Sequence, residues 1–391
     1  MTFEEIKQQE HEYLMQTYAR FDVALTRGKG ATAVDINGKR YIDFTSGIGV
    51  NVLGYCDVGF ASAISSQTRT ITHTSNLYYS PVQVELAKKL CNATVFDKVF
   101  LCNSGAEANE CAIKLARKYS FDKYGKGRHK IVSLLQSFHG RTLTTLSMTG
   151  QESLHDFFFP FTEGFSYSEA NMESIEKAVD SETCAVAIEL IQGEGGVIPL
   201  NENFVKSLAK FCKEKDILLI VDEVQTGVGR TGKLFCYEHY GLKPDILTAA
   251  KGLGGGLPIG ACLCSAELGS VFSAGSHGST FGGNPIACAG ASYVLDQVNS
   301  YKFLSEVSRK GALIQRLLSD MSDVVSIRGK GLMIGIEIKG DARKIAEKCA
   351  ENGLLILTAK TLLRMLPPLN ITDDEIEAGL SILNKVLREY A

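Results

Sequence analysis

The sequence lacks the features that would direct it to a membrane or out of the cell. No apolar run approaches the roughly 18 residues that a membrane-spanning helix needs. The first ten residues are polar and acidic, so they contain neither the basic segment nor the apolar stretch of a secretory signal. The sequence contains no low-complexity tract that would indicate disorder. We therefore expect a folded, cytoplasmic protein that does not insert into a membrane.

The sequence also lacks the patterns that commonly bind metals or nucleic acids. Its 11 cysteines form no C-x-x-C motif and its 7 histidines form no H-E-x-x-H motif, so we expect reduced, structural thiols and no metal site. Lys and Arg number 41 against 44 Asp and Glu, which gives a net charge of −3. Because no block of Lys and Arg stands out, nucleic acid is not expected as a partner.

What the sequence does contain is enough apolar material for a large core. The chain has 391 residues, of which 45% are hydrophobic. At roughly 150 residues per domain, this length favours two or three domains. A chain of this size buries a core large enough to fold without disulfides or structural metals.

Short apolar segments alternate with helical segments in the middle of the chain. The pattern predicts strands at residues 98–102, 130–135, 185–190, 218–221, 246–248 and 260–264, and helices at residues 106–119 and 203–214. Nearly continuous apolar strands that alternate with helices are typical of a mostly parallel sheet covered on both faces. We therefore expect the α/β fold class.

The two ends of the chain have a different pattern. Residues 4–15 favour a charged helix, and two alternating segments around Asn37 and Gly38 predict a hairpin with strands at 32–35 and 40–44. Further helices are predicted at 286–298, 301–321, 342–352 and 373–390, and further strands at 325–328 and 333–339. We expect a large domain over residues 57–285 and a smaller α+β domain formed by residues 1–56 and 286–391.

A cluster of small residues follows the predicted strand 98–102, at the edge where open α/β sheets bind ligands. It contains Ser104, Gly105 and Ala106, just before a predicted helix. Free backbone N–H groups and the positive end of the dipole at a helix start attract phosphate. An ordinary helix cap is the alternative interpretation.

Three more clusters follow predicted strands and supply an aromatic ring, a carboxylate and an amine. Phe138 and Arg141 could stack on a ring and bind a carboxylate, or belong to a surface loop. Asp222 ends an apolar strand, where a carboxylate either pairs with a cation or caps the chain. Lys251 precedes several glycines; in an apolar pocket its amine becomes a nucleophile, and otherwise it is an exposed lysine beside a loop.

One motif points to a different class of protein. Residues 227–232 match G-x-G-x-x-G, which in dinucleotide-binding proteins directly follows a strand and opens a helix. Here several residues separate the motif from its strand, and the segment after it is short and aromatic. A non-catalytic nucleotide-binding scaffold is therefore a weak alternative.

Together the four clusters provide a phosphate cradle, an aromatic plate, a buried carboxylate and an amine, the parts that pyridoxal phosphate requires. The sequence resembles the class III, ornithine-type (subgroup II) aminotransferases over nearly its whole length. The motifs that carry the resemblance, besides the four clusters, lie at residues 41–44, 73–78, 192–196, 277–285 and 364–369. The resemblance implies a fold-type I, aspartate-aminotransferase-like protein.

The resemblance implies roles for the cofactor residues. Lys251 binds pyridoxal 5'-phosphate covalently as a Schiff base and moves the proton, and Asp222 bonds the pyridinium nitrogen. Gln225 approaches the ring hydroxyl, and Glu189 supports Gln225. We do not count His139 among the catalytic residues. The remaining expected cofactor contacts are the ring neighbours Phe138 and Val224 and the phosphate neighbours Ser104, Gly105, Ala106, Ser279 and Thr280.

The resemblance also implies the substrates and the assembly. Arg141 and Arg364 match the arginines that bind substrate carboxylates, and Glu194 matches the glutamate that masks Arg364 in one half-reaction. Thr280 is expected to reach the cofactor of a second subunit, which implies a homodimer. The expected reaction transfers the ω-amino group of N2-acetylornithine to 2-oxoglutarate. Ornithine, succinylornithine, 4-aminobutyrate and an acetyl-lysine-type donor are alternatives, and a glutamate-1-semialdehyde aminomutase is less favoured.

The sequence departs from the family pattern in the early loop. The family has a Gly-His-x-His-Pro segment where this chain has Gly54, Tyr55, Cys56, Asp57 and Val58. The segment lies outside the expected cofactor contacts. The departure therefore puts loop geometry and substrate preference in doubt rather than the chemistry.

Overall fold

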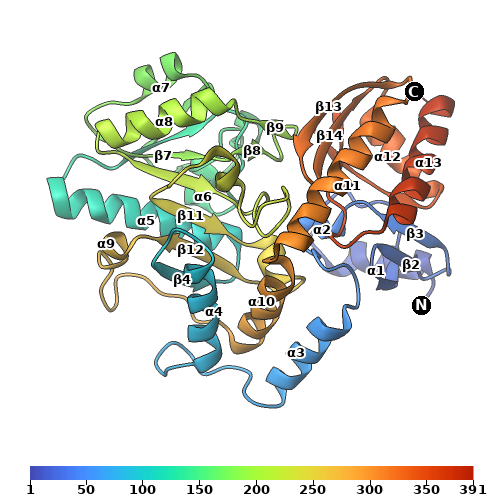
Figure 1. The fold of residues 1–391 in the computed structure, drawn as a ribbon, viewed down its shortest axis with the longest axis horizontal. Helices are drawn as coiled ribbons and strands as arrows, with labels where there is room; N and C mark the ends of the chain where they lie inside the picture. Colours follow the sequence, from blue (N-terminus) through green and yellow to red (C-terminus); the bar gives the residue numbers. More distant parts are fainter. Residues whose placement is uncertain (391) are drawn as a thin grey trace.

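The computed structural model describes residues 1–390, and its centre is a seven-stranded sheet (Figure 1). Along the sheet the strands are β4 (Lys98–Cys102), β12 (Gly260–Cys264), β11 (Ile246–Ala249), β10 (Leu218–Asp222), β7 (Thr183–Ile188), β5 (Lys130–Leu134) and β6 (Phe165–Ser168). β12 runs antiparallel to both of its neighbours, and the other six strands of this sheet run in one direction. The predicted mostly parallel sheet is confirmed, and β6 is a strand that the pattern missed.

The central strands are buried on both faces, as their continuous apolar sequences predict. Every residue of β7, β10, β11 and β12 is buried. Alternate residues face opposite sides: Leu218 and Ile220 pack in the core beside α5 (Gly105–Tyr124), whereas Leu219 and Val221 pack in the core beside α8 (Glu202–Glu214). Helices therefore cover both faces of the sheet.

A second sheet is antiparallel and lies in the C-terminal part of the chain. Its strands, in order, are β13 (Val324–Lys330), β14 (Met333–Ile338), β17 (Leu362–Met365) and β16 (Leu357–Ala359). The helices of this part are α11 (Tyr301–Ser319), α12 (Ala342–Glu351) and α13 (Asp373–Tyr390). The prediction found β13 and β14 but missed β16 and β17, which are only three and four residues long.

The two ends of the chain meet in a third sheet. It contains β1 (Leu25–Lys29), β2 (Thr32–Asp35), β3 (Arg40–Asp43) and β15 (Leu354–Leu355). The hairpin of β2 and β3 turns at Gly38, which has φ +84°, and β15 pairs with β3 in parallel. Figure 1 shows the N-terminal elements, including α1 (Phe3–Tyr13), beside the C-terminal ones. The domain boundaries near residues 57 and 285 stay a prediction.

The remaining elements are short or connect these sheets. They are α2 (Ser46–Gly49), α3 (Val58–Thr68), α4 (Pro81–Asn92), α6 (Leu143–Met148), α7 (Met172–Ala178), α9 (Ala266–Gly269), α10 (Pro285–Val298), β8 (Ile191–Gln192), β9 (Ile198–Pro199) and the 3₁₀ helices η1 (Glu152–Leu154), η2 (Cys236–Tyr240) and η3 (Lys251–Gly254). Among residues 1–390, no helix is both long and apolar enough to span a membrane, and no group of three metal-ligating side chains converges.

We expect Gly379→Ala to destabilise the contact between the two chain ends. Gly379 lies in α13 against the buried Phe44 ring, and an added Cβ would collide with that ring. Ala favours a helix by about 1 kcal/mol over Gly, but overpacking of a core costs about 1–3 kcal/mol. Urea unfolding should therefore report a lower free energy of unfolding. The exposed Ser381→Ala in the same helix is the control, and equal stabilities would contradict the packing argument.

Candidate active site

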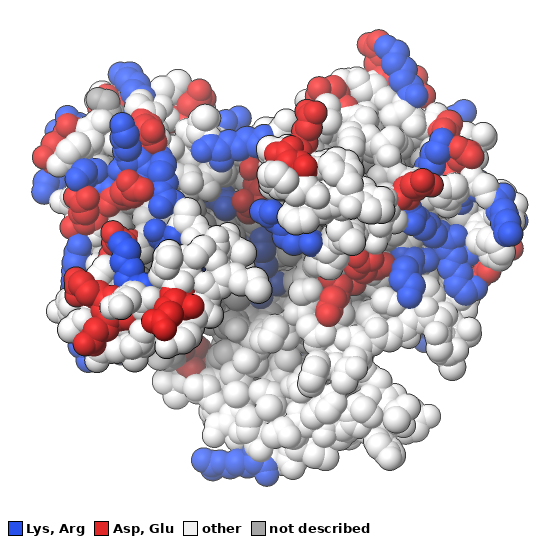
Figure 2. All heavy atoms as spheres, turned by 180° about the vertical axis from the view of Figure 1, so that it is seen from behind, with Lys and Arg blue, Asp and Glu red and all other residues white. Residues whose placement is uncertain are grey.

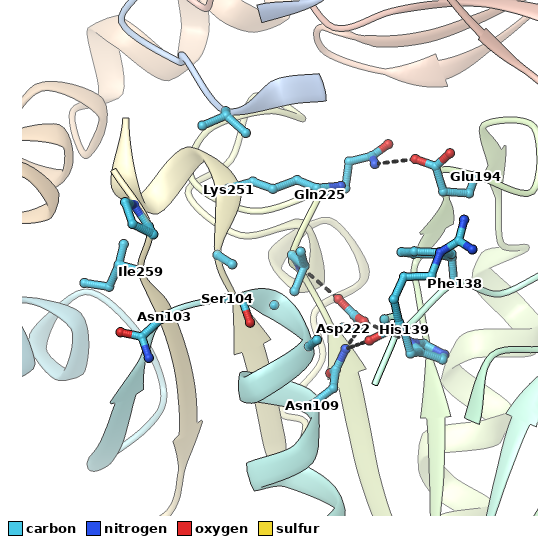
Figure 3. Close-up of a pocket in the computed structure, with 18 of the residues that line it drawn as sticks. Asn103, Ser104, Asn109, Phe138, His139, Glu194, Asp222, Gln225, Lys251 and Ile259 are labelled. Carbon is cyan, nitrogen blue, oxygen red and sulfur yellow. Dashed lines mark hydrogen bonds and ion pairs between the residues drawn. The ribbon is translucent and has the colours of Figure 1, made fainter. Parts of the chain in front are cut away.

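A cavity of about 670 Å³ lies where the predicted clusters converge (Figure 3). Figure 3 shows Lys251, Gln225, Asp222, Phe138 and Glu194 around it, from elements far apart in the sequence. The expected site residues that line it are Ser104, Gly105, Ala106, Phe138, Arg141, Glu189, Glu194, Asp222, Val224, Gln225 and Lys251. Its location at the carboxyl ends of parallel strands agrees with the sequence-based expectation.

The first cluster opens α5 at the cavity. The Ser104 hydroxyl accepts a hydrogen bond of 3.1 Å from the Glu107 N–H, so it caps the helix. The N–H groups of Gly105 and Ala106 belong to the first turn, where a helix offers them no acceptor of its own. A Cβ on Gly105 would lie 2.7 Å from a Val224 methyl carbon, so glycine is needed for this close approach. The helix-cap interpretation is confirmed, and phosphate binding by the free N–H groups stays a prediction.

The Asp222 carboxylate ends β10 and is only 5% exposed. Its Oδ2 accepts from Asn109 Nδ2 at 2.8 Å and lies 2.8 Å from His139 Nδ1, and its Oδ1 accepts from the Val224 N–H at 2.9 Å. These contacts satisfy a charge that would otherwise be costly to bury. The Asn109 and His139 partners were not predicted, because they come from other elements and become neighbours only in the fold.

The imidazole of His139 is a partner of the buried carboxylate that carries a positive charge when it is protonated. Its side chain is buried, and burial by itself disfavours the charged form. The hydrogen bond and charge of Asp222, together with the charge of Glu189, outweigh burial and raise the pKa of His139. His139 Nε2 has no hydrogen-bond partner among the described residues.

Lys251 begins η3 directly after β11, and its side chain extends toward the middle of the cavity (Figure 3). Its φ of +43° is unusual for a residue with a side chain, and strain of this kind is concentrated at functional sites. Burial lowers the pKa of the amine, and the Arg364 charge adds to this effect while Glu194 opposes it. A lysine with a lowered pKa is a suitable nucleophile for a carbonyl group.

A closed ion pair bounds the cavity on the side away from α5. Arg364 of β17 is 3% exposed and donates from Nη1 to Glu194 Oε1 at 2.6 Å and from Nη2 to Oε2 at 3.2 Å. Gln225 joins the pair, because its Oε1 accepts from Arg364 at 3.2 Å and its Nε2 donates to Glu194 at 3.2 Å. Although Glu194 is partly buried, the Arg364 charge lowers the pKa of its carboxyl. In this state Glu194 masks the guanidinium from the cavity.

Glu189 supports the site through backbone groups. Its Oε2 accepts from the Phe138 N–H at 2.9 Å and its Oε1 accepts from the Gly193 N–H at 3.4 Å. Gly193 lies so close to Gln225 that a Cβ would collide with that side chain, so the support of Gln225 is indirect. Burial, with a further contribution from Asp222, raises the pKa of Glu189 to about 7.

The other expected site residues are placed at the rim or outside the cavity. Arg141 is exposed, lines the cavity and lies 5.5 Å from the centre of the Phe138 ring. Ser279 does not line the cavity; its hydroxyl accepts from Asn103 Nδ2 at 3.0 Å. Thr280 is exposed. Tyr18 lines the cavity and was not predicted, because its N-terminal segment has no strand end or motif to mark it.

The G-x-G-x-x-G segment does not form a dinucleotide site. Residues 227–232 are buried turns, and the segment leads to the short 3₁₀ helix η2 rather than to an α-helix that starts at the glycines. Gly229 and Gly232 have positive φ values of +84° and +87°. These glycines therefore shape a buried loop.

The comparisons with known proteins agree with this geometry. The family model Aminotransferase class-III matches residues 13–387. The acetylornithine aminotransferase of Haemophilus ducreyi is 49% identical over 393 residues and is covered, like this chain, over 100% of its length. The N-acetylornithine aminotransferase of Stenotrophomonas maltophilia has a solved structure that is 35% identical, with a TM-score of 0.84 and 98% of each chain covered. An ornithine aminotransferase structure from Toxoplasma gondii, with partial occupancy of PLP at its active site, is 33% identical, with a TM-score of 0.94 and coverage of 100% of this chain and 95% of that one.

The fold and the cavity define a pyridoxal-phosphate-dependent transferase of fold type I. The chain belongs to the class III aminotransferase family. The residues fit the cofactor of this family: the start of α5 offers free N–H groups to a phosphate, Asp222 offers a buried carboxylate and Lys251 offers an amine of lowered pKa. Glycine at position 105 allows Val224 to approach closely, which a Cβ would prevent.

We expect Asp222→Asn to lower the pKa of His139 below its ordinary value of 6.5, because burial remains while the charge partner is lost. In the unchanged protein this pair stabilises the fold fully below pH 6.5, and that stabilisation is lost as the pH rises through the raised pKa of His139. Histidine ring NMR titration measures the pKa directly. Asp245→Asn, remote from His139, is the control, and an unchanged His139 pKa in Asp222→Asn would refute the pairing.

Proposed function

We propose that this chain transfers the ω-amino group of N2-acetylornithine to 2-oxoglutarate, giving N-acetylglutamate 5-semialdehyde and glutamate, a step of arginine biosynthesis. The observation that carries the proposal is the Glu194–Arg364 pair beside the Lys251 amine. The names of the relatives from Haemophilus ducreyi and Stenotrophomonas maltophilia support the donor. Ornithine is the second candidate donor, since the neighbour from Toxoplasma gondii is an ornithine aminotransferase.

The chemistry depends on pyridoxal phosphate, which when bound withdraws the electron pair that remains after a proton leaves the substrate carbon. Gly105 and Ala106 would hold its phosphate through their N–H groups, with Ser104 beside them. The Asp222 carboxylate, paired with His139, would keep a proton on the ring nitrogen. Phe138 and Val224 would lie against the ring, and Gln225 would approach its hydroxyl. The Lys251 amine would accept the proton at the substrate carbon and return it at the neighbouring carbon.

The two arginines would let one cavity accept two unlike substrates in turn. With Arg364 masked by Glu194, a donor would place the carbon that bears its ω-amine beside Lys251 while Arg141 at the rim binds its carboxylate. When 2-oxoglutarate enters, its second carboxylate competes with Glu194 for Arg364. One carboxylate then replaces another at the guanidinium, so the more deeply buried charge of the pair would stay paired.

We also propose that the enzyme is a cytoplasmic homodimer. Several large apolar side chains near the exposed Thr280 are open to solvent on a single chain, namely Leu77, Tyr78, Tyr79 and Phe281. Figure 2 shows a lower face almost free of charged residues, the kind of surface that a partner subunit covers. The 11 free cysteines, ten of them at least partly buried, support a reducing compartment.

We expect N-acetylornithine alone to convert the absorption of the bound pyridoxal phosphate to that of pyridoxamine phosphate, and 2-oxoglutarate to reverse the change. Lys251→Ala should bind the cofactor but slow this conversion by about 10⁴-fold or more, because it removes the group that moves the proton. Stopped-flow absorbance checks both. Conversion by ornithine but not by N-acetylornithine would identify ornithine as the donor. Wild-type rates in Lys251→Ala would refute the mechanism.

We expect Glu194→Gln to shift the preference toward donors with a free α-amino group, because Arg364 stays unmasked for their carboxylate. A charge-assisted hydrogen bond is worth about 1.5–3 kcal/mol, so the ratio of kcat/KM for N-acetylornithine to that for glutamate should fall at least about tenfold. The exposed Glu202→Gln serves as the control. If the ratio does not change, Glu194 does not act as a switch.

A further inference from the structure

Arg230 is a buried cation inside the glycine-rich loop that did not fit a nucleotide site. Its side chain is 1% exposed. Its Nη1 donates to the Leu332 carbonyl at 3.1 Å and to the Pro367 carbonyl at 2.5 Å, and its Nη2 donates to the Ser46 hydroxyl at 3.4 Å. No carboxylate bonds to the guanidinium, and its Nε has no partner within residues 1–390.

The three acceptors belong to segments that are far apart in the sequence. Ser46 follows β3, Leu332 lies in the turn between β13 and β14, and Pro367 follows β17. The same segments are bonded to one another, because the Leu332 N–H donates to the Arg230 carbonyl at 2.9 Å and the Ser46 hydroxyl donates to the Leu366 carbonyl at 2.5 Å. Arg230 therefore lies at the joint between the central sheet and the parts built from the two chain ends.

The segment 222–232 holds the end of β17 at two places. Gln225 contacts Arg364 at one place, and this contact belongs to the Glu194 pair that opens and closes. Arg230 contacts Pro367 at the other place, three residues further along, where no titratable group competes for the bond. The Gln225 attachment therefore involves the ion pair that the proposed function requires to open, whereas the Arg230 attachment does not.

We propose that Arg230 is a positioning residue that holds β17 in place while Arg364 exchanges Glu194 for a substrate carboxylate. This inference rests on the proposed function, since it concerns the same switch. Because β17 is paired with β14 and β16, we expect the loss of Arg230 to let this sheet as a whole shift against the central sheet when the Arg364 ion pair opens, so that the guanidinium meets the incoming carboxylate in a poorer geometry. A misplacement of even about 1 Å weakens such a directed contact.

The chemistry of the anchor supports a positioning role over a purely structural one. A buried cation without a bonded carboxylate is costly, and apolar replacement of buried charges is often neutral or stabilising. Stability alone therefore does not require arginine here. Its planar fork reaches two carbonyls and a hydroxyl in fixed directions, which the single ammonium of lysine does not reproduce.

The test measures binding of glutarate, a dicarboxylate that lacks both amine and keto group, to the pyridoxal-phosphate-loaded enzyme by titration calorimetry. We expect Arg230→Met to weaken glutarate binding about tenfold and to raise the KM for 2-oxoglutarate to a similar extent, with a smaller effect on the donor half-reaction. Arg230→Lys should bind glutarate more tightly than Arg230→Met and more weakly than the wild type. If Arg230→Met does not fold, Ser46→Ala, which removes one acceptor, should weaken glutarate binding about threefold.

Two control variants separate positioning from general effects. Arg309→Met removes an exposed arginine that pairs with Asp373, and Ile314→Val makes a small cavity in the core of α11. The inference is overturned if Arg230→Met binds glutarate as the wild type does, or if Ile314→Val weakens binding equally at an equal fall in melting temperature. If wild-type enzyme binds no glutarate and 2-oxoglutarate is not an acceptor, the proposed function itself fails.

Discussion

The burial of the Asp222 charge is the constraint on which the cavity depends. The carboxylate stands at the end of a strand buried on both faces, so its partners must come from the protein. Asn109 comes from α5 and His139 from the loop after β5, and Asn109 is itself fixed by the Thr248 hydroxyl at 2.8 Å. To satisfy this one charge, the helix α5 and the ends of two strands must be held in fixed positions relative to one another.

A second buried charge, that of Arg364, joins the two parts of the molecule across the cavity. Removal of one member of such a pair costs about 3–5 kcal/mol, because the other charge is left buried and unpaired. In the proposed function, a substrate carboxylate that took the place of Glu194 would avoid that cost. The burial that makes the pair hard to break would then favour a carboxylate over water or a neutral group.

The sequence was informative where the signal was local. Continuous apolar segments predicted six strands of the central sheet, and the residues after them predicted Asp222 and Lys251 from their own surroundings. Strand β6 was missed because it is a short edge strand only partly buried. The link between Glu194 and Arg364 came from family resemblance, since 170 positions separate the two residues and no periodicity joins them. His139 and Tyr18 needed the fold, because their roles follow from neighbours on other elements.

The loop at residues 54–58, where the sequence departs from the family pattern, is linked to the joint around Arg230 rather than to the expected cofactor contacts. The Tyr55 hydroxyl donates to Asp43 Oδ2 at 2.9 Å, and Asp43 Oδ1 accepts from the Ser46 N–H at 3.2 Å. Burial and the Asp43 charge raise the pKa of Tyr55, so the phenol keeps its proton and this bond at neutral pH. Ser46 in turn bonds to Arg230. We therefore expect a change in this loop to act on Arg364 through the joint, and to alter which carboxylates bind rather than whether the amine of Lys251 reacts.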